Sequence, residues 1–382
     1  MVGLELTFPV RGAKSSRTEM LVSIARPALG AEEIAAVVEV LRSGQLTQAE
    51  RVAEFERAFA GFHRAEHGIA TSSGTTALTA ALLAHEIGAG DEVIVPSFSF
   101  FASAATVVGV GAKPVFVDIE PDTYCLSPDA AEAAITARTR AIMAVHMYGH
   151  PADMVRLEAL CRARGLVLLE DVAHAPGARI DGRPVGSFGT AAFSFHPSKN
   201  LTTGEGGMVL TRDAAVAQRL RMIRSQGRAV PHGPHELFGY NFRMSEVSAA
   251  IGAIQLGRLP EAQKRRREHA AYLDRHLEGV GLPSVRPGSE HVYHQYTVRL
   301  PAGVERRSFL ERLRVDGIEA RVYYATPIHR EPAFERDGEY RSLSLPETER
   351  ACREVVSLPV HPGLTPDEVA RVARAASSAC RA

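Results

Sequence analysis

Apolar residues recur at helical spacing in several segments of the first half of the chain, and short runs of β-branched residues lie between them. Residues 31–43 (AEEIAAVVEVLRS) place apolar side chains three and four positions apart, with two glutamates in the first turn, as a helix N-terminus favours. Residues 92–96 (EVIVP) have the composition of a short strand. The same patterns predict helices over 52–62, 75–87, 103–110, 130–137 and 154–164, and strands over 114–118, 139–145 and 166–171.

The pattern changes in the second half. Two short strands, 191–195 and 207–211, flank a glycine-rich turn. A helix begins at residue 246, and we expect Pro260 to interrupt it because proline lacks the N–H that a helix interior needs. A basic helix follows over 264–278. Beyond it the pattern predicts strands over 296–300 and 320–324, and helices over 307–316 and 366–377.

Strands that alternate with helices indicate right-handed βαβ units and a mostly parallel sheet. We therefore predict an α/β fold with a mostly parallel central sheet in a large domain, residues 1–259. A smaller C-terminal α+β domain is expected over residues 260–382. The polar residues 1–19 are interpreted as a flexible arm, with Met20 as an alternative start.

Composition narrows the class of protein. Lys plus Arg and Asp plus Glu are both 44, so a net charge of zero gives no general attraction to nucleic acid or to an anionic membrane. The basic run 264–267 is interpreted as the solvated face of a helix. Four dispersed cysteines indicate neither a metal site nor a disulfide framework, and we expect a cytoplasmic location. We see no apolar run long enough for a signal peptide or a membrane span.

Two segments carry polar groups suited to binding an ion. One precedes a predicted helix and suits an anion, and the other ends a predicted strand and suits a cation. Residues 71–76 (TSSGTT) precede a helix, where backbone N–H groups form an anion site; an N-cap with a tight turn explains them equally well. Residues 166–174 (LVLLEDVAH) end an apolar strand at Asp171, where a buried carboxylate needs a cationic partner such as a pyridinium nitrogen. The alternatives are an N-cap for Asp171 and a packing role for His174.

An aromatic cluster and a lysine follow two other predicted strands. Phe100 lies in residues 96–101 (PSFSFF), at a strand end where ligands of α/β sheets bind, and is either a ring-stacking residue or part of the core. Lys199 lies in a loop, residues 193–200 (FSFHPSKN), that leads into the glycine-rich turn. Burial of a lysine is costly unless it is neutralised, and a Schiff base with pyridoxal phosphate (PLP) achieves this. A surface lysine in a turn is the alternative.

The order and wording of these segments resemble the DegT/DnrJ/EryC1/StrS family of PLP-dependent sugar aminotransferases, which has the fold type I architecture. The resemblance extends from about residue 24 to the C-terminus. It rests on ATSSGTTAL, GDEVIVPSFSF, KPVFVDIEPDTY, LLEDVAHA, FSFHPSKNLTTGEGG, GYNFRMSEVSAAIG, VYHQYTV and SLPVHPGLT. The chain departs from the family at Gln45, where an aromatic residue is common, and at Ala49, where glycine is common; both bear on substrate fit.

The resemblance implies a role for each matching residue. Lys199 forms the Schiff base and then transfers a proton, Asp171 binds the pyridine nitrogen, and His174 lies near the ring. Family members are homodimers with shared active sites, so Asn241 is expected to reach the cofactor of the partner subunit. The remaining cofactor residues are expected to be Ser73, Gly74, Thr75, Phe100 and Ser194, and the substrate residues His196, Arg243, Tyr324 and His329.

The resemblance also implies the reaction: an amino group passes from L-glutamate to a nucleotide-linked keto-sugar. The residues HPSK followed by TTGEGG favour C4 of a 4-keto-6-deoxy sugar, with a C3 keto-sugar or a keto-cyclitol as alternatives. Arg221, Arg224, Arg228 and Arg243 remain equal candidates for the diphosphate. A sugar dehydratase of this fold commonly has histidine in place of the cofactor lysine, so Lys199 argues against it. A non-catalytic binding or regulatory protein has no need of Lys199, Asp171 and a phosphate loop together.

Overall fold

The computed structural model describes residues 21–230, 232–336 and 338–381. Its centre is a seven-stranded sheet with the strand order β1-β9-β8-β5-β4-β2-β3. Strands β3, β2, β4, β5 and β8 run parallel, and β9 is antiparallel to both of its neighbours. The strands are β1 (His67–Thr71), β2 (Glu92–Pro96), β3 (Lys113–Val117), β4 (Thr139–Val145), β5 (Val167–Asp171), β8 (Thr190–Ser194) and β9 (Gly207–Thr211). The predicted mostly parallel sheet is confirmed.

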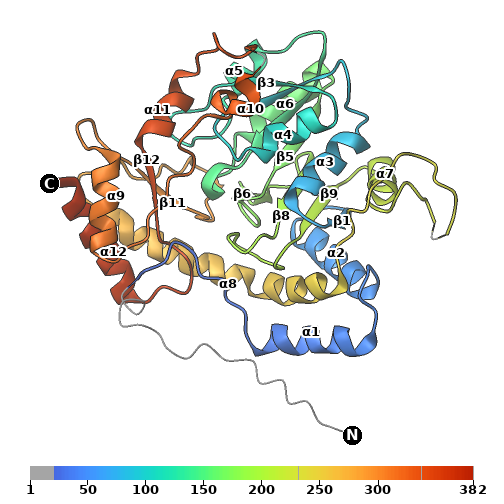
Figure 1. Cartoon of the computed structure of the whole chain (residues 1–382), viewed down its shortest axis with the longest axis horizontal. Coiled ribbons are helices and arrows are strands. Elements are labelled where there is room, and N and C mark those ends of the chain that lie inside the picture. The colour runs from blue at the N-terminus through green and yellow to red at the C-terminus, as the bar shows by residue number, and fades with distance from the viewer. Residues whose placement is uncertain (1–20, 231, 337, 382) are drawn as a thin grey trace, which may run out of the picture.

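Helices cover both faces of this sheet (Figure 1). Within one strand, Val93 and Val95 pack with α3 and α7, whereas Ile94 between them packs on the opposite side with α6. Strands buried on both faces are apolar throughout, which explains why they appear in the sequence as short uninterrupted hydrophobic runs. The helices of this part are α1 (Ala31–Ser43), α2 (Glu50–Phe62), α3 (Gly74–Ala84), α4 (Ala102–Gly109), α5 (Pro128–Ala133), α6 (Met154–Arg164) and α7 (Ala214–Arg224).

Helix α8 (Glu246–His276) runs without a break past Pro260 and reaches both parts of the molecule (Figure 1). The prediction that Pro260 interrupts it is wrong. Leu256 and Leu259 before the proline and Leu273 after it are buried in two different apolar clusters. Packing on both sides offsets the hydrogen bond that proline removes. The predicted domain boundary at 259/260 falls inside this helix and stays a prediction.

A smaller group of elements follows α8. Strands β11 (Tyr296–Arg299) and β12 (Val355–Leu358) pair antiparallel and pack with α9 (Arg306–Val315) and α12 (Pro366–Arg381). The strand expected over 320–324 is not formed, because Arg321 makes only an isolated bridge to Ser357. Short elements complete the fold: β6 (Arg179–Ile180), β7 (Arg183–Pro184), β10 (Ser289–Glu290), α10 (Pro332–Glu335) and α11 (Pro346–Glu354).

Two further sequence expectations concern the chain termini and membranes. Residues 1–19, interpreted as an arm, lie outside the described residues. Among the described residues, no helix combines the length and the apolar character that crossing a bilayer requires.

Candidate active site

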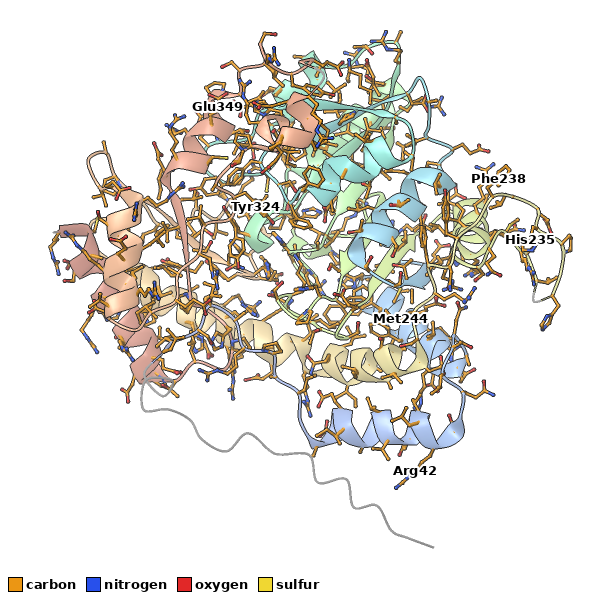
Figure 2. The ribbon with its side chains drawn as sticks, in the orientation of Figure 1. Arg42, His235, Phe238, Met244, Tyr324 and Glu349 are labelled. Atoms are coloured by element: carbon orange, nitrogen blue, oxygen red, sulfur yellow. The ribbon has the colours of Figure 1, made fainter. Side chains whose placement is uncertain are left out.

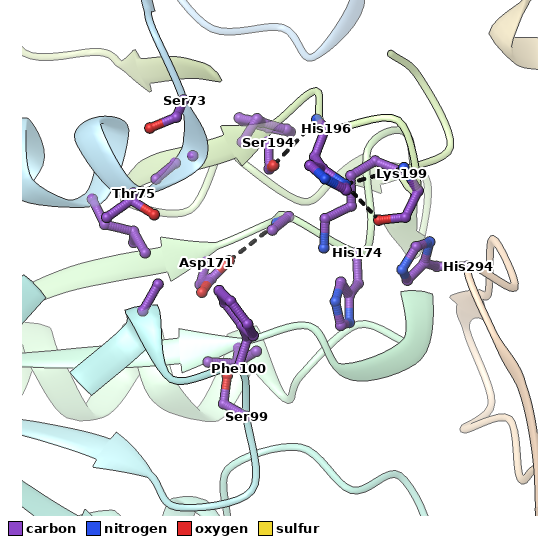
Figure 3. Close-up of a pocket in the computed structure, with 18 of the residues that line it drawn as sticks. Ser73, Thr75, Ser99, Phe100, Asp171, His174, Ser194, His196, Lys199 and His294 are labelled. Atoms are coloured by element: carbon purple, nitrogen blue, oxygen red, sulfur yellow. Dashed lines mark hydrogen bonds between the residues drawn. The ribbon is translucent and has the colours of Figure 1, made fainter. Parts of the chain in front are cut away.

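A cavity of about 390 Å³ opens at the carboxyl ends of the parallel strands. Asp171 is the last residue of β5, Ser194 is the last residue of β8, and Phe100 follows the end of β2. All three line this cavity, together with Lys199 and His174 (Figure 3). The parallel sheet therefore brings together residues that are far apart in the sequence, as the position of ligand sites in open α/β sheets predicts.

Asp171 is held as a buried carboxylate with only 6% of its surface exposed. Its Oδ2 accepts a hydrogen bond from the hydroxyl of Ser103 at 2.8 Å, and its Oδ1 accepts one from the backbone N–H of Ala173 at 3.1 Å. The hydroxyl of Ser99 lies 2.7 Å from that of Ser103. These donors hold the carboxylate of Asp171 in place and fix its orientation toward the cavity.

Lys199 lies in the turn after β8, where its backbone N–H donates to the carbonyl of His196 at 2.9 Å. It is the only lysine or arginine among the described residues that line the cavity. Burial lowers the pKa of its amine to about 8, although the charge of Asp171 acts in the opposite direction. A sizeable fraction of Lys199 is therefore uncharged near neutral pH and able to act as a nucleophile or a base.

The N-terminus of α3 forms an anion site beside these residues. The hydroxyl of Ser73 caps the N–H of Thr76 at 3.1 Å, while the N–H groups of Gly74 and Thr75 have no acceptor among the described residues. A side chain at Gly74 would place its Cβ 2.7 Å from Cβ of Ser194, so only glycine permits this close approach. Free N–H groups at a helix N-terminus suit a phosphate.

Two aromatic groups flank the space between Asp171 and Lys199 (Figure 3). The Phe100 ring is 57% exposed in the single chain and lies 6.2 Å from the ring of Tyr324. His174 is buried, and its Nδ1 has no hydrogen-bond partner among the described residues. Burial and the charge of Lys199 hold the pKa of His174 well below its usual value, so the imidazole is neutral.

These groups fit PLP on four observations. The free N–H groups of α3 suit its phosphate, the Asp171 carboxylate suits its pyridine nitrogen, the Lys199 amine suits its aldehyde, and Phe100 offers a surface for its ring.

Three of the predicted site residues lie outside the cavity lining. His329 is fully buried in a single turn, Ile328–Arg330, where its Nδ1 lies 2.7 Å from the hydroxyl of Ser97. Asn241 makes an isolated bridge to Ser225, which follows α7, and Arg243 makes one to Thr71, the last residue of β1. The predicted residues Ser73, Gly74, Thr75, Phe100, Asp171, His174, Ser194, His196, Lys199 and Tyr324 all line the cavity.

The sequence reasoning gave no role to Ser99, Ser103 and His294. Ser103 lies in the first turn of α4 and Ser99 lies in the loop before that helix, so only the fold brings their hydroxyls to Asp171. His294 lies in VYHQYTV, and its ring centroid is 4.3 Å from that of His174. Only the fold brings these two rings together.

Comparison with known proteins identifies the family. Residues 27–377 match the model of the DegT/DnrJ/EryC1/StrS aminotransferase family. The Streptomyces venezuelae dTDP-3-amino-3,4,6-trideoxy-alpha-D-glucose transaminase is 42% identical over 90% of this chain and 91% of its own length. The Acidithiobacillus ferrooxidans UDP-N-acetyl-3-dehydro-alpha-D-glucosamine 3-aminotransferase is 42% identical over 83% of this chain and 85% of its own length. A Geobacillus stearothermophilus pleiotropic regulatory protein is 43% identical over 86% of this chain and 89% of its own length.

The fold agrees as well. The crystal structure of S. venezuelae DesV with a ketimine intermediate superposes with a TM-score of 0.88, at 40% identity over 92% of this chain and 95% of that one. The predicted fold type I architecture is thereby confirmed. A match over nearly the whole chain, with the predicted lysine and aspartate in one cavity, places this chain in the DegT/DnrJ/EryC1/StrS aminotransferase family.

Proposed function

We propose that this aminotransferase moves an amino group from L-glutamate to the keto carbon of a nucleotide-linked sugar. The observation that carries the proposal is the cavity that joins Lys199, with a lowered pKa, to Asp171 and an anion site. The two relatives with transaminase names act on dTDP- and UDP-linked sugars by those names, which supports the same substrate class here.

The cofactor is PLP, which supplies an aldehyde that bonds the reacting nitrogen and a ring that withdraws electrons from the adjacent carbon. The amine of Lys199 would bond the aldehyde of the cofactor and, when an amino substrate replaced it there, would be free to accept and donate a proton. Asp171 would keep the pyridine nitrogen protonated, because its buried carboxylate accepts one hydrogen bond at each oxygen and has acceptor capacity left for that nitrogen. His174 borders the ring as a neutral imidazole.

The position of the keto group on the sugar is the finer part of the proposal. The sequence motifs favour C4, whereas both transaminase relatives carry C3 in their names. We give the names of these relatives more weight than a short motif, and propose a 3-keto sugar first and a 4-keto sugar as the alternative. A keto-cyclitol remains a third acceptor to test.

We also propose a cytoplasmic homodimer in which Asn241 serves the cofactor of the partner subunit. The loop after α7 projects from the body of the molecule and carries Phe238, which is 99% exposed (Figure 2). The ring of Tyr240 stacks on that of Phe242 at 4.8 Å next to Asn241. Exposed aromatic side chains around a polar residue suit a contact between subunits.

The test is the absorbance of the PLP-loaded protein before and after L-glutamate, with Lys199→Ala as the control. We expect the band of the bound cofactor to bleach in the wild type only. UDP- and dTDP-linked 3-keto and 4-keto sugars are then added with heavy-nitrogen-labelled glutamate, and labelled amino sugars are measured by mass spectrometry. Failure to bleach would overturn the transaminase proposal, and bleaching without any sugar product would overturn the substrate class.

One relative supports a second candidate, a regulatory role, because it is named a pleiotropic regulatory protein. Such a role does not need the lowered pKa of Lys199 or the carboxylate that faces it. The same experiment separates the two, since a purely regulatory protein would bind PLP without taking an amino group from L-glutamate.

A further inference from the structure

His294 is a third imidazole in the active-site cavity, besides those of His174 and His196, and the reaction as derived above does not use it. Its side chain comes from the segment before β11, on the opposite side of the cavity from the anion site (Figure 3). Its ring is only 5% exposed and lies against His174 with an angle of 34° between the ring planes.

The side chain of Asn200 determines which nitrogen of His294 carries the proton. Nδ2 of Asn200 donates to the carbonyl of Val292 at 3.2 Å, and since a carbonyl only accepts, this fixes the orientation of the amide. Oδ1 of Asn200 therefore faces Nδ1 of His294, at 3.2 Å. An amide oxygen also only accepts, so Nδ1 of His294 must be the protonated nitrogen.

The other nitrogen, Nε2, is then an acceptor without a donor. Burial and the nearby positive charges of Lys199 and Arg266 hold the pKa of His294 well below its usual value, so the ring is neutral. Among the described residues Nε2 has no hydrogen-bond partner, and unlike Nδ1 of His174 it is not sealed from solvent. A lone pair therefore faces the cavity.

The backbone of this segment is also held firmly. Arg266 is buried, and its Nη1 donates to the carbonyls of Tyr293 at 3.1 Å and of His294 at 3.4 Å. Asn200 ties the side chain and Arg266 ties the main chain, so the direction of Nε2 is set before substrate binds. Such preorganisation favours binding of a group with one particular geometry.

We propose that His294 positions the acceptor sugar: its Nε2 accepts a hydrogen bond from a sugar hydroxyl near the keto carbon. Sugar hydroxyls are donors, whereas the carboxylates of glutamate are acceptors and would be repelled by this lone pair. His294 thus serves the sugar half of the reaction and not the glutamate half. This inference rests on the proposed function and deepens it.

The test compares the two half-reactions in the PLP-loaded full chain. His294→Phe keeps a ring against His174 but removes the acceptor, and His294→Gln restores a polar acceptor near the position of Nε2. For the UDP- or dTDP-linked keto-sugar that the wild type aminates, we expect His294→Phe to raise KM about tenfold and His294→Gln about threefold or less, as the loss of one hydrogen bond implies. The rate of cofactor bleaching by L-glutamate should change much less than this KM.

A matched control and a second variant complete the design. His276 is exposed at the end of α8, so His276→Phe should leave both half-reactions as in the wild type. Asn200→Ala removes the acceptor that keeps the proton of His294 on Nδ1, and it should raise the KM for the keto-sugar by a smaller factor than His294→Phe does. An unchanged KM in His294→Phe, or equal losses in both half-reactions, would overturn the inference while the proposed function stands. If the wild type aminates no keto-sugar, both the inference about His294 and the proposed function are wrong.

Discussion

The hydroxyl of Ser103 donates to Oδ2 of Asp171 at 2.8 Å, although the two residues are 68 positions apart. Ser103 lies in α4 and Asp171 ends β5, and both side chains are buried. Helix α4 thus fixes the carboxylate that we propose binds the cofactor ring. Ser103 is therefore a positioning residue for the cofactor, acting through Asp171.

Replacing Ser103 by alanine should weaken cofactor binding. A hydrogen bond to a charged group contributes about 1.5–3 kcal/mol, so we expect the Kd for PLP to rise at least about tenfold. Titration of the cofactor-free protein with PLP measures this. Thr106→Val is the matched control, because that buried hydroxyl donates to backbone carbonyls of the same helix, those of Ala102 and Ser103, and not to Asp171. Equal weakening in both variants would mean that α4 is perturbed as a whole.

That Lys199 and Asp171 lie at one ligand cavity could be anticipated from the sequence, although their local surroundings left an N-cap and a surface lysine as alternatives and the family resemblance was needed to choose. Asp171 ends an apolar strand, and Lys199 follows another strand in a turn rich in polar residues and glycine. The roles of Ser103 and His294 could not be predicted in this way. They arise from contacts across the fold, to Asp171 and His174, that no local pattern encodes.

The wrong predictions have the same origin. Proline is unfavourable inside an isolated helix, yet Pro260 lies in α8 because apolar contacts on both sides hold the helix together. Residues 320–324 have strand-forming side chains, but Tyr323 and Tyr324 line the cavity instead of pairing with a neighbouring strand. Tertiary packing overrode local propensity in both places.

A side chain at Gly74 should damage the phosphate site selectively. The Cβ of Gly74→Ala would lie 2.7 Å from Cβ of Ser194, so the N-terminus of α3 must shift. We expect the affinity for PLP to fall more than about tenfold, while binding of pyridoxal, which lacks the phosphate, changes much less. Gly61→Ala in α2 is the control, since its Cβ would meet no atom within 4 Å. Equal losses for PLP and pyridoxal would argue against a phosphate at α3.

Glu246 should stabilise the folded chain through the loop that departs from the family at Ala49. Its buried carboxylate accepts the backbone N–H groups of Ala49, Arg51 and Val52 at 2.7, 2.9 and 2.9 Å. Glu246→Ala leaves these donors without a partner, and we expect the free energy of unfolding to fall by about 2–4 kcal/mol in urea titrations. Glu261→Ala, an exposed change in the same helix, should cost less than about 1 kcal/mol. Similar losses in both would refute the anchoring role.

The titration of Lys199 can be followed directly in the cofactor-free protein. Acetic anhydride reacts with the neutral amine, so labelling of Lys199 should rise with pH around a midpoint near 8, far below the ordinary value of 10.5. Asp171 raises this pKa, so Asp171→Asn should move the midpoint below 8. Mass spectrometry after pulse labelling reports it, with the exposed Lys264 as an internal reference.

The same shift has a consequence for stability with a defined sign. Because the folded state loses the proton of Lys199 at lower pH than the unfolded state, the unfolded chain binds more protons between about pH 8 and 10.5. The cofactor-free wild type should therefore gain stability over that range relative to Lys199→Met, in which no amine titrates. If the difference in the free energy of unfolding between the wild type and Lys199→Met does not change with pH, burial does not control the pKa of this lysine. If the labelling midpoint moves upward in Asp171→Asn, the charge of Asp171 does not raise that pKa.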